Sequence, residues 1–138
     1  MSTPRDDALY MARILDQAGR YEDMTEQMKI VVELDPALTP DERNLLSLAY
    51  KNVVTVKRSG LRMLGVITDH EENENNQARL DQLSQFREKL VADLVKVCLE
   101  LIGLVNKSLI PAATTPDSKV YYLKLKADYY RYICETQT

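Results

Sequence analysis

Tryptophan is absent from this sequence, and histidine and cysteine are rare, with one and two residues among 138. The single histidine, His70, excludes metal sites built from several histidines and weakens any Ser-His-Asp triad. Cys98 and Cys134 form neither a CxxC pair nor the framework of a disulfide-rich secreted domain. Because the rest of the sequence offers no acid/base pair, nucleophile or metal cluster, we expect no enzyme, no cofactor and no metal site.

Glycine and proline are also scarce, with four and five residues. Both interrupt helices, so their shortage favours long helices. No apolar run approaches the roughly 18–20 residues that span a membrane, and the first seven residues lack the apolar stretch of a signal peptide. We therefore expect a reduced intracellular chain, located in the cytoplasm or also in the nucleus, with no membrane partner.

Positive charge is not in excess, because 18 lysines and arginines stand against 21 aspartates and glutamates, for a net charge of −3. A nucleic-acid binder usually carries a basic excess, so we expect no nucleic-acid partner. Hydrophobic residues make up 45% and charged residues 28%, which is typical of a folded globular chain. A length of 138 residues leaves room for one domain.

Three Thr-Pro pairs, at positions 3–4, 39–40 and 115–116, indicate where helices begin. The threonine hydroxyl can accept a hydrogen bond from the first turn, where the missing N–H of proline is not needed. Thr39 and Glu42 additionally form a capping-box pattern. With breaks at Gly19 and Asp35-Pro36, the sequence predicts an all-α antiparallel array of five helices, at about 4–18, 20–34, 40–68, 75–108 and 116–136. A polar linker and a last loop are expected at 69–76 and 111–116.

Alternating spacings of four and three residues run along the third and fourth helices, which is typical of antiparallel helices packed on each other. The stripe of the third helix comprises Leu46, Tyr50, Val53, Lys57, Gly60, Leu64 and Ile67. The stripe of the fourth comprises Leu80, Leu83, Arg87, Leu90, Leu94, Val97, Leu101 and Leu104. A second stripe widens it after residue 90, with Val91, Val95, Cys98, Ile102 and Val105.

The last helix is apolar around most of its circumference between Val120 and Ile133. Such a helix needs cover on several sides, and four other helices do not suffice. We therefore expect the chain to be the front part of a longer protein.

Two short lines of positive charge lie beside these apolar surfaces. Lys51, Arg58 and Arg62 follow i, i+7, i+11 spacing, and Lys124 and Arg131 follow i, i+7 spacing with Asp128 and Tyr132 alongside. Focused cationic lines on an acidic protein indicate a site for a compact anion, and paired guanidinium groups suit phosphate. The alternative is a solvated cationic face with intrahelical pairing of Lys124 and Asp128.

Two long segments resemble the signature sequences of the 14-3-3 proteins: Arg43–Val54, RNLLSLAYKNVV, and Ser118–Tyr132, SKVYYLKLKADYYRY. The shorter segments Gln17–Met24 and Leu109–Ala112 fit as well. This resemblance implies the first five helices of a nine-helix, cup-shaped, dimeric fold. It also implies a non-enzymatic protein that binds phosphoserine and phosphothreonine peptides.

The resemblance also implies roles for individual residues. The phosphate would be bound by Arg58, Arg131, Tyr132 and Lys51. Lys124 and Leu48 would line the peptide groove, and Arg62 would support the pocket. The five cations among these are the ones that helical spacing alone selects.

A dimer contact is the second implication, with helices at about 4–34 for dimerisation and helices at about 40–136 for the groove. Arg20 with Asp93, and Asp23 with Lys89, would form ion pairs between subunits. The apolar contact would comprise Ile14, Ala18, Gly60, Leu64, Ile67 and Phe86. The alternative is that these apolar residues all belong to the core of one chain.

Several departures from the family pattern indicate a divergent member, among them Gly60 in place of a serine and Leu61 in place of a tryptophan. The helices beyond the fifth would supply the apolar wall of the groove. Two functions therefore stay open. One is an adaptor that docks phosphorylated motifs as a dimer. The other is a dimerisation module that pairs with itself or with other 14-3-3 chains and binds no peptide.

Overall fold

The chain folds into an array of helices in a computed structural model that describes residues 1–137. The elements, in order, are α1 (Pro4–Gln17), α2 (Tyr21–Leu34), α3 (Pro40–Asn73), α4 (Gln77–Leu104), the π-helical turn η1 (Val105–Leu109), α5 (Ile110–Ala112) and α6 (Pro116–Glu135). No strand occurs within residues 1–137, so the predicted all-α class is confirmed.

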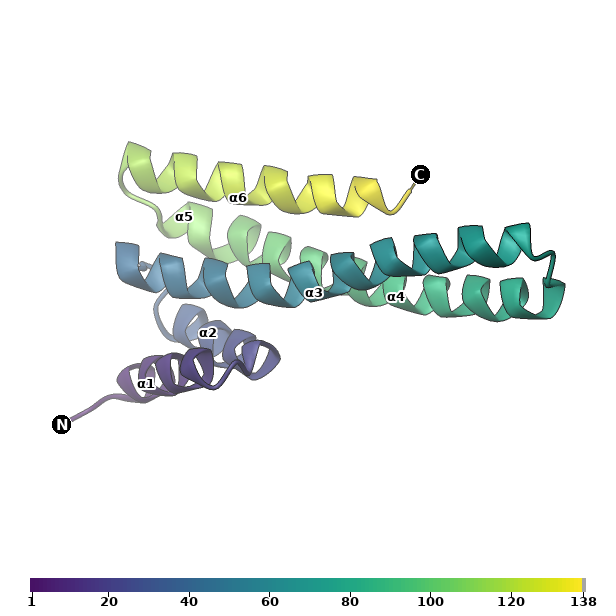
Figure 1. The fold of residues 1–138 in the computed structure, drawn as a ribbon. Helices are drawn as coiled ribbons and strands as arrows, with labels where there is room; N and C mark the ends of the chain where they lie inside the picture. Colours follow the sequence, from purple (N-terminus) through teal and green to yellow (C-terminus); the bar gives the residue numbers. More distant parts are fainter. Residues whose placement is uncertain (138) are drawn as a thin grey trace.

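The long helices α3 and α4 form an antiparallel hairpin that is the spine of the molecule (Figure 1). The short helices α1 and α2 pack on each other and on α3, whereas α6 packs along α4 (Figure 1). The far end of the hairpin extends beyond the other helices (Figure 1). No helix within residues 1–137 is both long and apolar enough to cross a bilayer.

The three predicted helix starts are confirmed. The hydroxyl oxygens of Thr3, Thr39 and Thr115 accept hydrogen bonds from the third residue of each helix, at 3.1, 3.2 and 3.2 Å. The capping box expected at Thr39 is complete, because Oε1 of Glu42 accepts from the backbone N–H of Thr39 at 3.0 Å. Cap chemistry is local to one turn, which explains why sequence alone locates these starts.

The predicted end of the third helix is wrong. Helix α3 continues through the expected linker to Asn73, and only residues 74–76 connect it to α4. The turn comes at Asn75, whose φ of 58° lies in the left-handed region that asparagine tolerates. A polar stretch without glycine or proline indicates exposure to water, and it does not by itself end a helix.

The predicted last loop at 111–116 is also too long. The helical path continues from α4 through η1 and α5 to Ala112, so the loop is confined to residues 113–115. Pro111 cannot donate a backbone hydrogen bond, and the turn before it widens so that the N–H of Ile110 donates to the carbonyl of Val105.

The core lies where α2, the first half of α3, the second half of α4 and α6 meet. Its fully buried side chains include Met24, Met28, Leu46, Tyr50, Leu94, Cys98, Leu101 and Tyr122. The stripes predicted for α3 and α4 therefore face the core near these positions. Before residue 90, however, α4 has no buried residue, because most of this part of the helix lies on the projecting hairpin beyond the other helices.

Within residues 1–137, helix α6 is buried along one side and exposed along another. Tyr122 and Tyr129 are buried, whereas Val120, Leu123 and Tyr130 are 64%, 54% and 44% exposed. The other helices of the chain therefore leave much of its apolar circumference open, as the sequence analysis expected.

Helix α1 is held to the start of α3 by a two-pronged ion pair. Nη1 and Nη2 of Arg5 donate to the Glu42 carboxylate at 2.8 and 2.9 Å, and Nη2 also donates to the carbonyl of Asp35 at 3.3 Å. The Arg5 guanidinium lowers the pKa of Glu42 from its ordinary value of 4.5. Because the folded-state pKa is the lower one, the pair stabilises the fold above pH 4.5, and this contribution is lost as the pH falls.

Replacing Glu42 with glutamine is expected to lower the free energy of unfolding at pH 7 by about 1–3 kcal/mol, because charge-assisted hydrogen bonds are lost. Urea unfolding followed by circular dichroism at pH 7 and pH 3.5 would measure it. The difference in the free energy of unfolding between Glu42→Gln and the original chain should be smaller at pH 3.5 than at pH 7. Glu72→Gln, at an exposed position, is the control. A loss of equal size at both pH values would contradict the role assigned to the Glu42 charge.

Candidate phosphate site around Tyr132

The ring of Tyr132 on α6 is the point at which the two predicted phosphate-binding arginines meet. The guanidinium carbon of Arg58, from α3, lies 4.4 Å from the ring centroid, and that of Arg131 lies 5.3 Å from it. Both distances fall in the range of cation–π contacts. The fold therefore brings together residues that are more than seventy positions apart in sequence.

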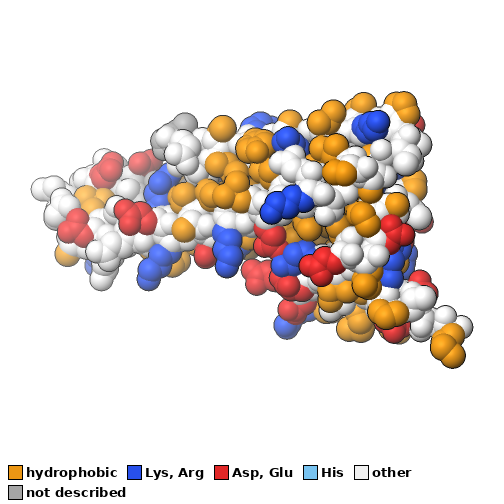
Figure 2. All heavy atoms as spheres, turned by 180° about the vertical axis from the view of Figure 1, so that it is seen from behind, with side chains coloured by type: hydrophobic (Ala, Val, Ile, Leu, Met, Phe, Trp, Pro, Cys, Tyr) orange, Lys and Arg blue, Asp and Glu red, His pale blue; other side chains and the backbone are white. Residues whose placement is uncertain are grey.

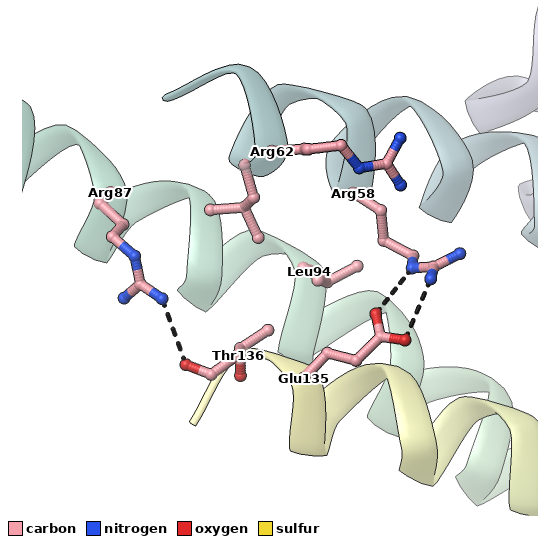
Figure 3. Close-up of a pocket in the computed structure, with 7 residues that line it drawn as sticks. Arg58, Arg62, Arg87, Leu94, Glu135 and Thr136 are labelled. Atoms are coloured by element: carbon pink, nitrogen blue, oxygen red, sulfur yellow. Dashed lines mark hydrogen bonds and ion pairs between the residues drawn. The ribbon is translucent and has the colours of Figure 1, made fainter. Parts of the chain in front are cut away.

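Arg58 is also bound by a carboxylate that sequence reasoning missed. Its Nε donates to Oε2 of Glu135 and its Nη2 to Oε1, each at 3.0 Å (Figure 3). This is the parallel, two-bond geometry that a guanidinium makes with a carboxylate. Glu135 lies four residues after Arg131 on α6, so helical spacing would have placed it on the same face.

Asp128 pairs with two cations of α6, Lys124 and Arg131. Its carboxylate lies 3.3 Å from Nζ of Lys124 and 3.7 Å from Nη2 of Arg131. The intrahelical pair of Lys124 and Asp128, which the solvated-face alternative expected, is therefore present. Lys51, in contrast, is exposed and makes no ion pair with the described residues.

Two neighbouring hollows divide the predicted residues. One, of about 240 Å³, is lined by Ser47, Lys51, Tyr121, Lys124, Leu125, Asp128, Tyr129 and Tyr132. The other, of about 220 Å³, is lined by Arg58, Leu61, Arg62, Arg87, Leu94, Glu135 and Thr136 (Figure 3). Arg131 lines neither hollow, and Leu48 is half-buried against the core.

Arg87 is a second residue that the sequence analysis did not assign to the site. It reaches the site from α4, where its Nη2 donates to the carbonyl of Thr136 at 3.4 Å (Figure 3). The signal was present in the sequence, because Arg87 is a charged residue at an otherwise apolar position of the α4 stripe. It adds a third guanidinium to the walls of the smaller hollow.

Two hydroxyl groups hold the start of α6 to α3 beside the larger hollow. The hydroxyls of Ser47 and Tyr121 are hydrogen-bonded to each other, and that of Tyr121 also donates to the carbonyl of Arg43 at 3.3 Å. Beneath the site, burial raises the pKa of the Cys98 thiol to about 11. Cys98 is therefore an inert core residue.

The residues predicted for a dimer contact lie mainly on the surface. Ile14, Ile67 and Phe86 are 40%, 43% and 53% exposed, so these three do not form the core of one chain. Leu64 is 6% exposed and lies inside the chain. Ala18 is exposed and Gly60 is half-buried.

Arg20 and Asp23, predicted to reach across a dimer, pair with each other in this chain. Their Nη2 and Oδ2 atoms are 2.8 Å apart, and both side chains are largely exposed. Lys89 and Asp93 are exposed on α4 and make no ion pair with the described residues.

The family model for the 14-3-3 proteins matches residues 11–138. The chain belongs to the 14-3-3 family. It is 42% identical over 135 residues to the 14-3-3-like protein GF14-G of Oryza sativa subsp. japonica, covering 98% of this chain and 52% of that protein. It is 43% identical over 134 residues to the checkpoint signal transducer rad24 of Schizosaccharomyces pombe, covering 97% of this chain and 50% of that protein. The 14-3-3 family protein artA of Aspergillus flavus is 42% identical to it over 130 residues, covering 94% of this chain and 55% of that protein.

The chain thus spans about half the length of the 14-3-3 relatives that it matches. The five longer helices of the structure agree with part of a 14-3-3 helical array. The matched region includes all of α3, α4 and α6, which carry the residues around Tyr132.

Proposed function

We propose that this 14-3-3 chain binds peptides containing phosphoserine or phosphothreonine at the residues around Tyr132. The observation that carries the proposal is the convergence of Arg58 and Arg131 on one tyrosine ring. A phosphate group carries a charge of about −1.5 to −2 and three acceptor oxygens, so it can use several guanidinium donors together. Lys51, Lys124 and Arg62 would add positive potential beside the site, and Leu48 would contribute to the groove.

The phosphate must compete with the carboxylates already present. The side chains of Arg58 and Glu135 are 28% and 44% exposed, and an exposed pair is worth about 0–1 kcal/mol. A phosphate carries more charge than a carboxylate and has a third acceptor oxygen, so it can contact several guanidinium groups at once. This difference favours replacement of Glu135 by phosphate at Arg58.

The proposal extends to an adaptor that acts in the cytoplasm, without enzymatic activity, by docking phosphorylated partner proteins as a dimer. In that dimer, Arg20 and Asp23 would face Asp93 and Lys89 of a second copy. Ile14, Ala18, Gly60, Ile67 and Phe86 would form the apolar contact, and Leu64 would support it from within.

A second candidate function is a dimerisation module that pairs with itself or with other 14-3-3 chains and binds no peptide. The exposure of Ile14, Ile67 and Phe86 favours it, because these apolar side chains are available to be buried against a second chain.

Fluorescence anisotropy with a labelled phosphoserine peptide and its unphosphorylated twin would separate the two functions. We expect binding of the phosphopeptide only, and weaker binding as salt increases, because the contact is electrostatic. A helical, folded sample that binds neither peptide would leave the dimerisation module as the better description.

A further inference from the structure

The side chain of Arg58 is held on two sides, and only one of them involves the aromatic ring. Its guanidinium carbon lies 4.4 Å from the centroid of the Tyr132 ring. Its Nε–Nη2 edge donates to the Glu135 carboxylate (Figure 3). The third nitrogen, Nη1, makes no hydrogen bond to the described residues. Glu135 therefore leaves Nη1 as a donor for an incoming anion, which must displace Glu135 to use the other edge.

A peptide carboxylate gains nothing from that displacement. It would form the same two bonds that Glu135 already forms, at 3.0 Å each. Glu135 also has the advantage of being tethered to α6, so its effective concentration at Arg58 far exceeds that of a ligand in solution. A phosphate differs, because its larger charge and third oxygen allow it to contact further cations at the same time.

We propose that Glu135 is a specificity-determining residue, which keeps aspartate and glutamate side chains away from Arg58 and reserves the site for phosphorylated ones. The inference rests on the proposed phosphopeptide binding. It assigns Glu135 a role in rejecting the wrong ligand, which differs from a role in holding Arg58 in position. The two roles predict opposite effects of removing the carboxylate.

The test uses three peptides that differ at one position, which holds serine, phosphoserine or glutamate. Their affinities are compared for the original chain, Glu135→Gln and the control Glu33→Gln, an equal charge change at an exposed position of α2. Glu135→Gln is expected to strengthen binding of the glutamate peptide by about two- to fivefold, the scale of one exposed ion pair. The phosphopeptide should change less, so the preference for phosphate over carboxylate falls. The control should leave the preference unchanged.

A second readout does not depend on peptide binding. The Nε–H signal of Arg58 in ¹⁵N-arginine-labelled protein, assigned by its loss in Arg58→Lys, would be followed by NMR during titration with phosphate or acetate. In the original chain we expect phosphate to move this signal at lower concentration than acetate. In Glu135→Gln, the concentrations of phosphate and acetate that move this signal should become more similar.

The outcomes separate the two proposals. The role of Glu135 would be overturned by two results together. The preference for the phosphoserine peptide over the glutamate peptide would be unchanged in Glu135→Gln, and phosphate and acetate would still move the Arg58 signal at concentrations as different as in the original chain. Weaker binding of both anionic peptides would overturn it as well, and would make Glu135 a positioning residue for Arg58. A chain that binds no phosphopeptide but shows the expected NMR change would remove the proposed function and retain the rejection of carboxylates by Glu135.

Discussion

Replacing Arg58 with glutamate is expected to abolish phosphopeptide binding, with at least about a hundredfold loss of affinity. The variant removes up to two charge-assisted hydrogen bonds to the phosphate and adds a repulsive charge at the same place. It also removes the guanidinium from the face of Tyr132, 4.4 Å from the ring centroid. Anisotropy titration with the phosphoserine peptide would measure the loss.

Folding must be monitored in the same variant, because Arg58→Glu places two carboxylates where an ion pair stood. The pair is exposed, so we expect an unchanged helical signal in circular dichroism and a small change in stability. Arg13→Glu on α1 gives the same change in net charge at an exposed position and should bind normally. Retained affinity in a folded Arg58→Glu sample would remove Arg58 from the phosphate site.

Arg58→Lys refines the assignment. Lysine keeps the charge but loses the fork of donors and most of the stacking on Tyr132, so it should bind more weakly than the original chain and more tightly than the glutamate variant. If lysine binds as well as arginine, net charge alone draws the peptide, and the paired geometry around Tyr132 contributes nothing.

The sequence predicted those parts of the molecule that depend on neighbouring residues. Helix starts at Thr3, Thr39 and Thr115 were found because a cap forms within one turn. The cations near Tyr132 were found because the spacing of a helix places Lys51, Arg58 and Arg62 along one line, and the family resemblance selected the same residues.

Contacts between helices could not be predicted in the same way. The pair of Arg58 and Glu135 joins residues 77 positions apart, and it exists because α6 ends beside the middle of α3. That placement depends on where α4 ends and how the chain turns at Pro111. The loop predicted at 111–116 was too long, so the position of this turn was not predicted correctly. The prediction of a linker from residue 69 was wrong for a related reason. The polar residues 69–73 are polar because they lie at the exposed tip of the hairpin, and they are still helical.

The second large effect is expected at the dimer contact, when the charges of Arg20 and Asp23 are exchanged in the double variant R20D/D23R. The two side chains pair with each other at 2.8 Å, and the exchange preserves that internal pair. It reverses only their match to Asp93 and Lys89 of a second copy. Because a two-fold contact repeats each cross-subunit pair, four attractions become repulsions, and we expect self-association to weaken by at least about tenfold.

Sedimentation equilibrium over a range of protein concentrations would measure this change, and the difference should shrink in high salt. The compensating quadruple variant, with K89D and D93K added, should recover association because every cross-subunit pair regains opposite charges. Phe86→Asp tests the apolar part of the same surface, since Phe86 is 53% exposed and burying it should contribute more than any single ion pair. If the charge exchange, its compensation and Phe86→Asp all leave association unchanged, the chains meet through another face, and the apolar side of α6 at Val120, Leu123 and Tyr130 becomes the surface to substitute next.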